Sequence, residues 1–150
     1  MQNPYTKTQK AKVYKNKGNS KYNSGNYKSA IDDYDKVIKI KPKYATAYLH
    51  RGMSKVMIGD YNGAIADYDA AIEINPKYEE AYFKRGNSKY SIGNYNEAIA
   101  DFNTAIKLNP KDADAYSHRG MSKSMLEDYK GALADYDISK KLQNTKQLIS

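Results

Sequence analysis

Apolar residues recur every three or four positions along the chain, in segments of about 14 residues. Within residues 45–78, one segment runs from Tyr48 to Met57 and a second from Tyr61 to Ile72. This spacing is typical of amphipathic helices, and no stretch of useful length alternates as a strand does. Gly59-Asp60 separates the two segments, and Pro76 follows the second, where it would end a helix. The pattern predicts two helices joined by a tight turn.

This helical pair occurs four times without a gap, at a period of 34 residues. The repeats cover residues 11–44, 45–78, 79–112 and 113–146, with a short extension at 1–10 and a short end at 147–150. Self-similarity at a fixed period indicates a solenoid, in which each repeat buries its apolar face only against its neighbours. We therefore expect an all-α protein that forms one continuous array rather than two domains.

Aromatic, small and proline residues stand at the same offsets in each repeat. The first helix carries Tyr14, Tyr48, Tyr82 and Tyr116, then Gly18, Gly52, Gly86 and Gly120; the second carries Ala30, Ala64, Ala98 and Ala132, then Tyr34, Tyr68, Phe102 and Tyr136; Pro42, Pro76 and Pro110 close the first three repeats. The pattern resembles the tetratricopeptide repeat (TPR) over about nine-tenths of the chain. The resemblance implies a right-handed α-solenoid of four helix-turn-helix hairpins, whose first helices line a concave groove for an extended peptide or a partner helix.

Six positions of each first helix form a stripe at helical spacing: the second, fifth, sixth, ninth, twelfth and thirteenth of the repeat. From this stripe we expect the following residues to bind the peptide: Lys15, Asn19, Tyr22, Leu49, His50, Met53, Met57, Phe83, Lys84, Asn87, Tyr90, His118, Met121 and Met125. Repeats one and three present Asn and Tyr, whereas repeats two and four present His and paired Met, so this surface repeats every 68 residues. Methionines would form deformable apolar pockets, and asparagines would hold the ligand backbone. Duplication of an ancestor with two hairpins would leave the same 68-residue period without any role in binding. A role in binding and simple duplication therefore both stay open as explanations of this period.

Some members of the family hold a C-terminal carboxylate with lysine, asparagine and arginine side chains from three repeats. The resemblance places Lys15 and Asn19 at two of these positions. At the other three stand His50, Glu80 and Lys84. Because Glu80 would repel a carboxylate, we do not expect this chain to bind chaperone tails in that way.

Charged residues also recur with the repeat. An arginine of the first helix lies level with an aspartate of the second helix in three of the antiparallel hairpins. We therefore expect three ion pairs: Arg51–Asp67, Arg85–Asp101 and Arg119–Asp135. A ladder of cations that binds phosphates is the alternative, and the matched aspartates favour structural pairing.

The net charge of +8 is concentrated in the first 44 residues. Residues 11–44 hold nine Lys against three Asp, and each later repeat is nearly neutral. A protein that gripped a long polyanion with its whole surface would spread this charge, so the sequence argues against a nucleic-acid partner. The basic end is either a local patch for an acidic partner or a solvated end that keeps the protein soluble. The alternatives to peptide binding are an adaptor that binds an acidic or nucleic-acid partner through the Lys-rich first repeat, and an assembly or spacer element that acts through its ends.

No candidate chemistry stands out beside the groove. The chain has no Cys, and the positions three and four after His50 and His118 hold Met and Ser, so we expect no metal site and no cofactor. Without a phosphate loop, a nucleophile motif or a recurring acid–base pair, we expect no enzyme activity. No segment is apolar enough for a signal peptide or a membrane span, so we expect a soluble, cytoplasmic protein without a membrane partner.

The fourth repeat departs from the others near its end. Asn144 replaces the closing proline, and Ser139 and Lys140 stand where other repeats have apolar residues, which would give the last helix a polar outer face. Too few residues follow 142 for an additional capping helix. The sequence therefore predicts that the chain self-associates through this uncapped helix, or that a partner covers it.

Overall fold

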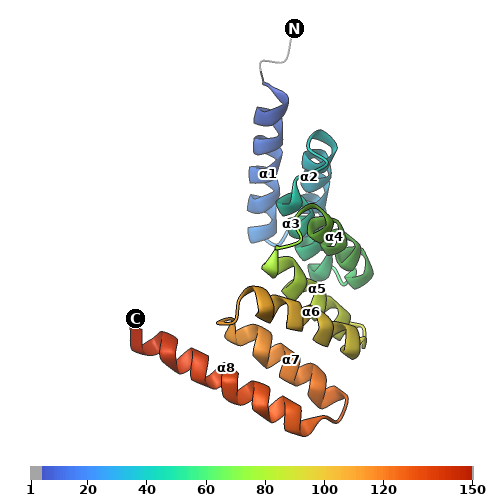
Figure 1. The fold of residues 1–150 in the computed structure, drawn as a ribbon. Helices are drawn as coiled ribbons and strands as arrows, with labels where there is room; N and C mark the ends of the chain where they lie inside the picture. Colours follow the sequence, from blue (N-terminus) through green and yellow to red (C-terminus); the bar gives the residue numbers. More distant parts are fainter. Residues whose placement is uncertain (1–4, 150) are drawn as a thin grey trace. The chain divides into compact units, whose positions relative to one another are not determined.

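Helices alone build the fold in residues 5–149, the part of the chain that the computed structural model describes. Eight helices follow one another in this part: α1 (Lys7–Asn23), α2 (Tyr27–Ile40), α3 (Ala45–Met57), α4 (Tyr61–Ile74), α5 (Glu79–Ser91), α6 (Tyr95–Leu108), α7 (Ala113–Met125) and α8 (Tyr129–Ile149). They pair as four hairpins, each made of two consecutive helices (Figure 1). The all-α fold and the four hairpins predicted from the apolar spacing are confirmed.

The helices form two compact units, which divide after Pro76. Unit 1 contains α1 to α4 and unit 2 contains α5 to α8. In unit 1, α2 packs on both α1 and α3, α3 packs on α4, and α1 also touches α3. Helices α5 to α8 repeat this arrangement in unit 2. Each unit therefore holds one copy of the 68-residue period, with an Asn/Tyr hairpin followed by a His/Met hairpin.

Each hairpin turns through a residue with positive φ. Gly25 and Gly59 have φ of 81° and Gly93 has φ of 84°, a left-handed conformation that glycine adopts without strain. The fourth turn instead holds Glu127 at φ 63°. A side chain in this conformation costs about 1 kcal/mol.

Within each hairpin, an aromatic ring lies against the glycine of the first helix. A Cβ atom added at Gly18 would lie 2.8 Å from Cε1 of Tyr34, and one added at Gly86 would lie 2.8 Å from Cε1 of Phe102. Both rings are buried. Only a residue without a side chain lets the two helices approach this closely, as the sequence pattern predicted.

The predicted arginine–aspartate pairs are present in three hairpins. Asp67 is 3% exposed and accepts two hydrogen bonds from Arg51, at 3.0 Å from Nε and 2.6 Å from Nη2. Nζ of Lys55 lies 2.9 Å from the same carboxylate. The equivalent pairs form between Arg85 and Asp101 and between Arg119 and Asp135, each joined by a lysine. The recurrent cations therefore hold the hairpins together.

Helices α1 and α8 are longer than their counterparts. Helix α1 begins at Lys7, before the predicted repeat start at 11, and α8 continues to Ile149, beyond the predicted repeat end at 146. No proline stands at 144 to stop α8. The predicted extension and end are thus partly helical, while residues 1–4 and 150 lie outside the described residues. Ser139, placed on a polar outer face by the sequence analysis, is instead buried, whereas Lys140 is exposed.

Candidate peptide-binding site

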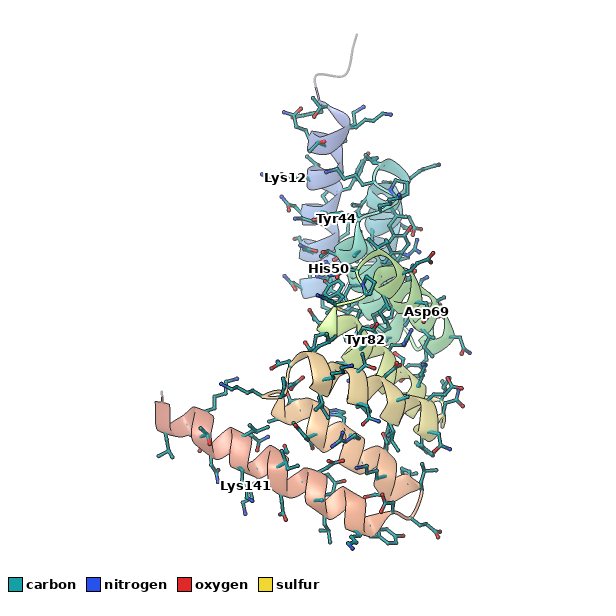
Figure 2. The ribbon with its side chains drawn as sticks, viewed as in Figure 1. Lys12, Tyr44, His50, Asp69, Tyr82 and Lys141 are labelled. Carbon is teal, nitrogen blue, oxygen red and sulfur yellow. The ribbon has the colours of Figure 1, made fainter. Side chains whose placement is uncertain are left out.

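A cavity of about 240 Å³ opens on unit 1, among α1, α2 and α3. Its lining consists of Asn19, Tyr22 and Asn23 of α1, Tyr34 of α2, and His50 and Met53 of α3. Figure 2 shows His50 where α3 passes close to α1. The structure thus brings together five residues of the stripe. Four of them, Asn19, Tyr22, His50 and Met53, were expected to bind the peptide, and the fifth is Asn23, at the thirteenth position of the repeat.

Tyr34 is the lining residue that the sequence analysis assigned to the framework alone. Its ring is buried against Gly18, but its hydroxyl donates a hydrogen bond to Oδ1 of Asn19 at 2.8 Å. The ring centre also lies 5.7 Å from that of His50. Burial, followed by the proximity of Tyr22 and Asp33, raises the pKa of Tyr34 to about 12. The hydroxyl therefore keeps its proton at neutral pH and remains a donor.

The Tyr34 bond decides what Asn19 offers to a ligand. An asparagine side chain has one acceptor oxygen and one donor amide. Tyr34 already uses one of the two acceptor sites of the oxygen and holds the amide in a fixed orientation, so the amide nitrogen of Asn19, with two N–H groups, is the larger part of what remains for a ligand. Tyr22 adds a second hydroxyl, and burial together with Tyr27 raises its pKa as well. The cavity is thus rich in hydrogen-bond donors.

A lysine lies one helical turn before Asn19 on the same face of α1. Lys15 is partly buried, and its Nζ lies 3.4 Å from the hydroxyl oxygen of Tyr44, which Figure 2 labels. None of the residues that line the cavity is a carboxylate. The local charge therefore favours a ligand group that accepts hydrogen bonds or carries negative charge.

Unit 2 presents the same positions with two changes. Asn87, Tyr90, His118 and Met121 match the residues of unit 1, whereas Ser91 replaces Asn23 and Phe102 replaces Tyr34. Phe102 has no hydroxyl, and Oδ1 of Asn87 is buried without a hydrogen-bond partner among residues 5–149.

An aromatic cluster takes the place of the lysine in unit 2. Phe83 stands at the fifth position of the repeat, which Lys15 holds in unit 1. Its ring centre lies 5.1 Å from that of His118 and 5.8 Å from that of Phe102. The two units therefore differ in both charge and hydrogen-bonding capacity at equivalent positions.

Comparison with protein families shows to which family the chain belongs. The family model described as Tetratricopeptide repeat matches residues 11–44, and the model described as TPR repeat matches residues 56–93 and 86–122. The chain belongs to the tetratricopeptide repeat family. No curated protein matches the sequence.

Solved structures agree with this assignment. A crystal structure of MamA is 23% identical, with a TM-score of 0.88 over 91% of this chain and 80% of that one, which shows the shared fold. The first TPR of Spaghetti (RPAP3), bound to the HSP90 peptide SRMEEVD, is 28% identical, with a TM-score of 0.78 over 79% of this chain and 94% of that one. The second TPR domain of human RPAP3, in complex with the HSP70 peptide SGPTIEEVD, is 29% identical, with a TM-score of 0.76 over 79% and 98%. The chain is accordingly a protein-interaction scaffold of the TPR class.

The prediction that Leu49 faces the groove is wrong. Leu49 is only 1% exposed, so its side chain belongs to the core and is closed to a ligand. It occupies the fifth position of the repeat, where Lys15 of the first repeat and Phe83 of the third repeat are partly buried as well. The predicted stripe was therefore too wide on this side.

The remaining predicted residues lie on first helices outside the cavity. Met57, Met121 and Met125 are among the exposed large apolar residues. Lys84 lies 3.8 Å from the carboxylate of Glu80, which partly offsets its charge. Their part in binding stays a prediction.

Two kinds of site are absent from the described residues. Between residues 5 and 149, no group of three or more His, Cys, Asp or Glu side chains could hold a metal ion. No helix in that range is long and apolar enough to cross a membrane.

Proposed function

We propose that this TPR protein binds an extended peptide or a partner helix along its first helices, and that the cavity of unit 1 holds one anchoring side chain. The observation that carries this proposal is the convergence of Asn19, Tyr22, His50 and Met53 on one cavity. A volume of about 240 Å³ suits a single side chain, because drug-sized ligands need roughly 300 Å³ or more. Partners in this mode are proteins or peptides.

The chemistry of the cavity favours a peptide that presents a hydrogen-bond acceptor. Asn19 and Tyr22 supply donors, Lys15 adds a positive charge one turn away, and Met53 offers an adaptable apolar wall. The peptides held by the two RPAP3 domains support a peptide as the class of ligand. Their EEVD ends are not the expected sequence here, since Glu80 and His50 differ from the carboxylate-binding pattern.

Selection of peptides from a random library displayed on phage, with the protein immobilised, tests the proposal. We expect wild type to enrich a family of related peptides, and Met53→Glu to bind a synthetic copy of the best one about tenfold more weakly or worse, since a buried anchor contributes about 1.4 kcal/mol or more. Ile58→Glu is the matched control, because Ile58 is exposed at the turn between α3 and α4 and lies outside the cavity. Equal binding by Met53→Glu and wild type would contradict the proposal. The peptide SRMEEVD serves as a second probe, for which we expect weak binding.

A second candidate rests on the lysine excess of residues 11–44. If an acidic partner bound these lysines, its affinity would fall steeply as salt rises, because counterions are released on binding. Groove binding through Met53 would fall much less with salt, because Lys15 adds a single charge beside the cavity. The sequence also predicted that a second copy of the chain is a partner. Such self-association would use the outer face of α8, which carries none of the groove residues.

A further inference from the structure

One polar contact joins neighbouring hairpins inside each unit. In unit 1, Nη1 of Arg51 on α3 lies 2.7 Å from Oδ1 of Asp35 on α2. In unit 2, Nη1 of Arg119 on α7 donates to Oδ1 of Asn103 on α6 at 2.8 Å. The arginine is the seventh residue of its repeat, and the acceptor is the twenty-fifth residue of the repeat before it. The contact thus fixes the register between the second helix of one hairpin and the first helix of the next.

Helices α8 and α1 carry the two halves of this contact unpaired. The twenty-fifth residue of the fourth repeat is Asp137, which is exposed on α8 and pairs with no cation of the described chain. The seventh residue of the first repeat is Lys17, exposed on α1. Its Nζ lies 5.9 Å from the ring centre of Tyr14 and meets no carboxylate among residues 5–149. The two unpaired groups have opposite charges.

Apolar side chains surround Asp137 on the same helix. Tyr129 and Leu133 of α8 are each 63% exposed. The residues at the same repeat positions of α2 are Tyr27 and Ile31, and both are partly buried. Tyr27 lines a pocket together with Ile58, the residue that follows α3, and its ring centre also lies 5.4 Å from that of Tyr22 on α1. The outer face of α8 therefore resembles the face of α2 that receives α3, but without its cover.

Helix α1 offers the complementary features. Val13 is 41% exposed, whereas Ala47, at the same repeat position of α3, is fully buried in a cluster with Val37 of α2. Helix α1 also extends at its N-terminal end, and α8 extends at its C-terminal end. In the antiparallel register of α2 and α3, these two extensions would lie beside each other.

We propose that the chain self-associates head to tail, with α1 of one copy docked on the outer face of α8 of a second copy, in the register that α3 and α2 adopt within unit 1. Lys17 then pairs with Asp137 of the second copy as Arg51 pairs with Asp35. Val13 lies near Ser139, the counterpart of the Val37 that Ala47 meets in unit 1, and the C-terminal half of α1 covers Tyr129 and Leu133. The contact is heterologous, so it adds copies beyond a dimer unless it closes into a ring. This assembly goes beyond peptide binding and uses none of the cavity residues.

Sedimentation velocity over a concentration series, from about 10 μM to about 1 mM at low salt, tests the proposal. We expect the average mass of wild type to rise with concentration to more than twice that of the monomer. Lys17→Glu alone and Asp137→Lys alone should each remain monomeric, because like charges then face each other. An equimolar mixture of the two variants should associate again, since it provides opposite charges at each contact.

Matched variants separate the proposed contact from a general effect of charge. Lys12→Glu and Asp32→Lys make the same charge changes at exposed positions outside this register, and both should associate as wild type does. Leu133→Glu should remain monomeric, whereas Ile58→Glu and Met53→Glu should not change the assembly. A wild type that stays monomeric throughout, or a mixture of Lys17→Glu and Asp137→Lys that fails to associate, would overturn the proposal and leave the peptide-binding proposal untouched.

Discussion

Replacing Phe102 by tyrosine is expected to stabilise unit 2, because the ring already occupies the place that Tyr34 has in unit 1. A Cβ added at Gly18 would lie 2.8, 3.0 and 3.1 Å from Cε1, Cζ and Cδ1 of Tyr34, and one at Gly86 would have the same three distances to Phe102. A hydroxyl on Phe102 would therefore reach Asn87 as that of Tyr34 reaches Asn19, where the bond measures 2.8 Å.

The expected gain follows from the unpaired oxygen. Oδ1 of Asn87 is buried without a hydrogen-bond partner in the described part of the chain, which costs about 1–3 kcal/mol, and a typical hydrogen bond adds a net stability of about 1 kcal/mol. Because the new hydroxyl is itself removed from water, we expect the free energy of unfolding to rise by about 1 kcal/mol for Phe102→Tyr. The reverse change, Tyr34→Phe, removes the same bond in unit 1 and should lower it by about the same amount.

Urea unfolding followed by circular dichroism measures both changes. A gain of about 1 kcal/mol moves the midpoint upward by about 0.5 M for a slope of about 2 kcal/mol/M. Asn87→Ala completes a double-mutant cycle: in that background, Phe102→Tyr buries a hydroxyl without an acceptor and should destabilise instead. If Phe102→Tyr were neutral or destabilising while Tyr34→Phe cost about 1 kcal/mol, the equivalence of the two ring positions would be refuted.

Three further substitutions test other parts of the structure. Burial, a hydrogen bond with Asp112 and the charges of Asp112 and Glu80 raise the pKa of Glu79 to about 7. The folded chain then holds this proton more tightly than the unfolded chain, so stability should fall as pH rises from about 4.5 to about 7, and Glu79→Gln, but not Glu80→Gln, should flatten urea midpoints across that window. Glu127→Gly should raise the free energy of unfolding by about 1 kcal/mol by relieving the left-handed φ of 63°; no rise in the urea midpoint would contradict this. Asp67→Asn should lower thermal and urea stability by about 3 kcal/mol, since Arg51 and Lys55 lose a buried carboxylate, whereas the exposed Asp32→Asn should change little.

The helices and their pairing could be predicted from the sequence because they depend on features that recur four times. Apolar spacing marks each helix, a glycine marks the close approach to an aromatic ring, and Arg51 and Asp67 match at the same period. Each of these contacts lies within one hairpin. Local spacing is therefore enough to predict them.

Other features depend on contacts that spacing alone does not encode. Leu49 was expected to face the groove, but the helix turns its position toward the packed side, and a stripe of six positions is wider than the open surface. Tyr34 was assigned to the framework because the repeat pattern treats tyrosine and phenylalanine as equal. Its hydroxyl, which orients Asn19, becomes visible only once the two helices are placed together. Comparison of Tyr34 with Phe102 in the sequence was the one signal that could have revealed it.

The two open interpretations of the 68-residue period make different demands on the residues around the cavity. If the period is only inherited from a two-hairpin ancestor, the two copies should differ mainly at positions where packing tolerates substitution. The changes instead include Lys15 to Phe83 and Tyr34 to Phe102, two positions that set the charge and the donor groups of the site. Both rings of unit 2 pack against His118, so these changes are structurally matched to each other. Unit 1 consequently offers donors and a positive charge where unit 2 has the partly buried Phe83 and the buried Phe102 around His118, and we therefore expect the two units to differ in the ligand groups that they accept.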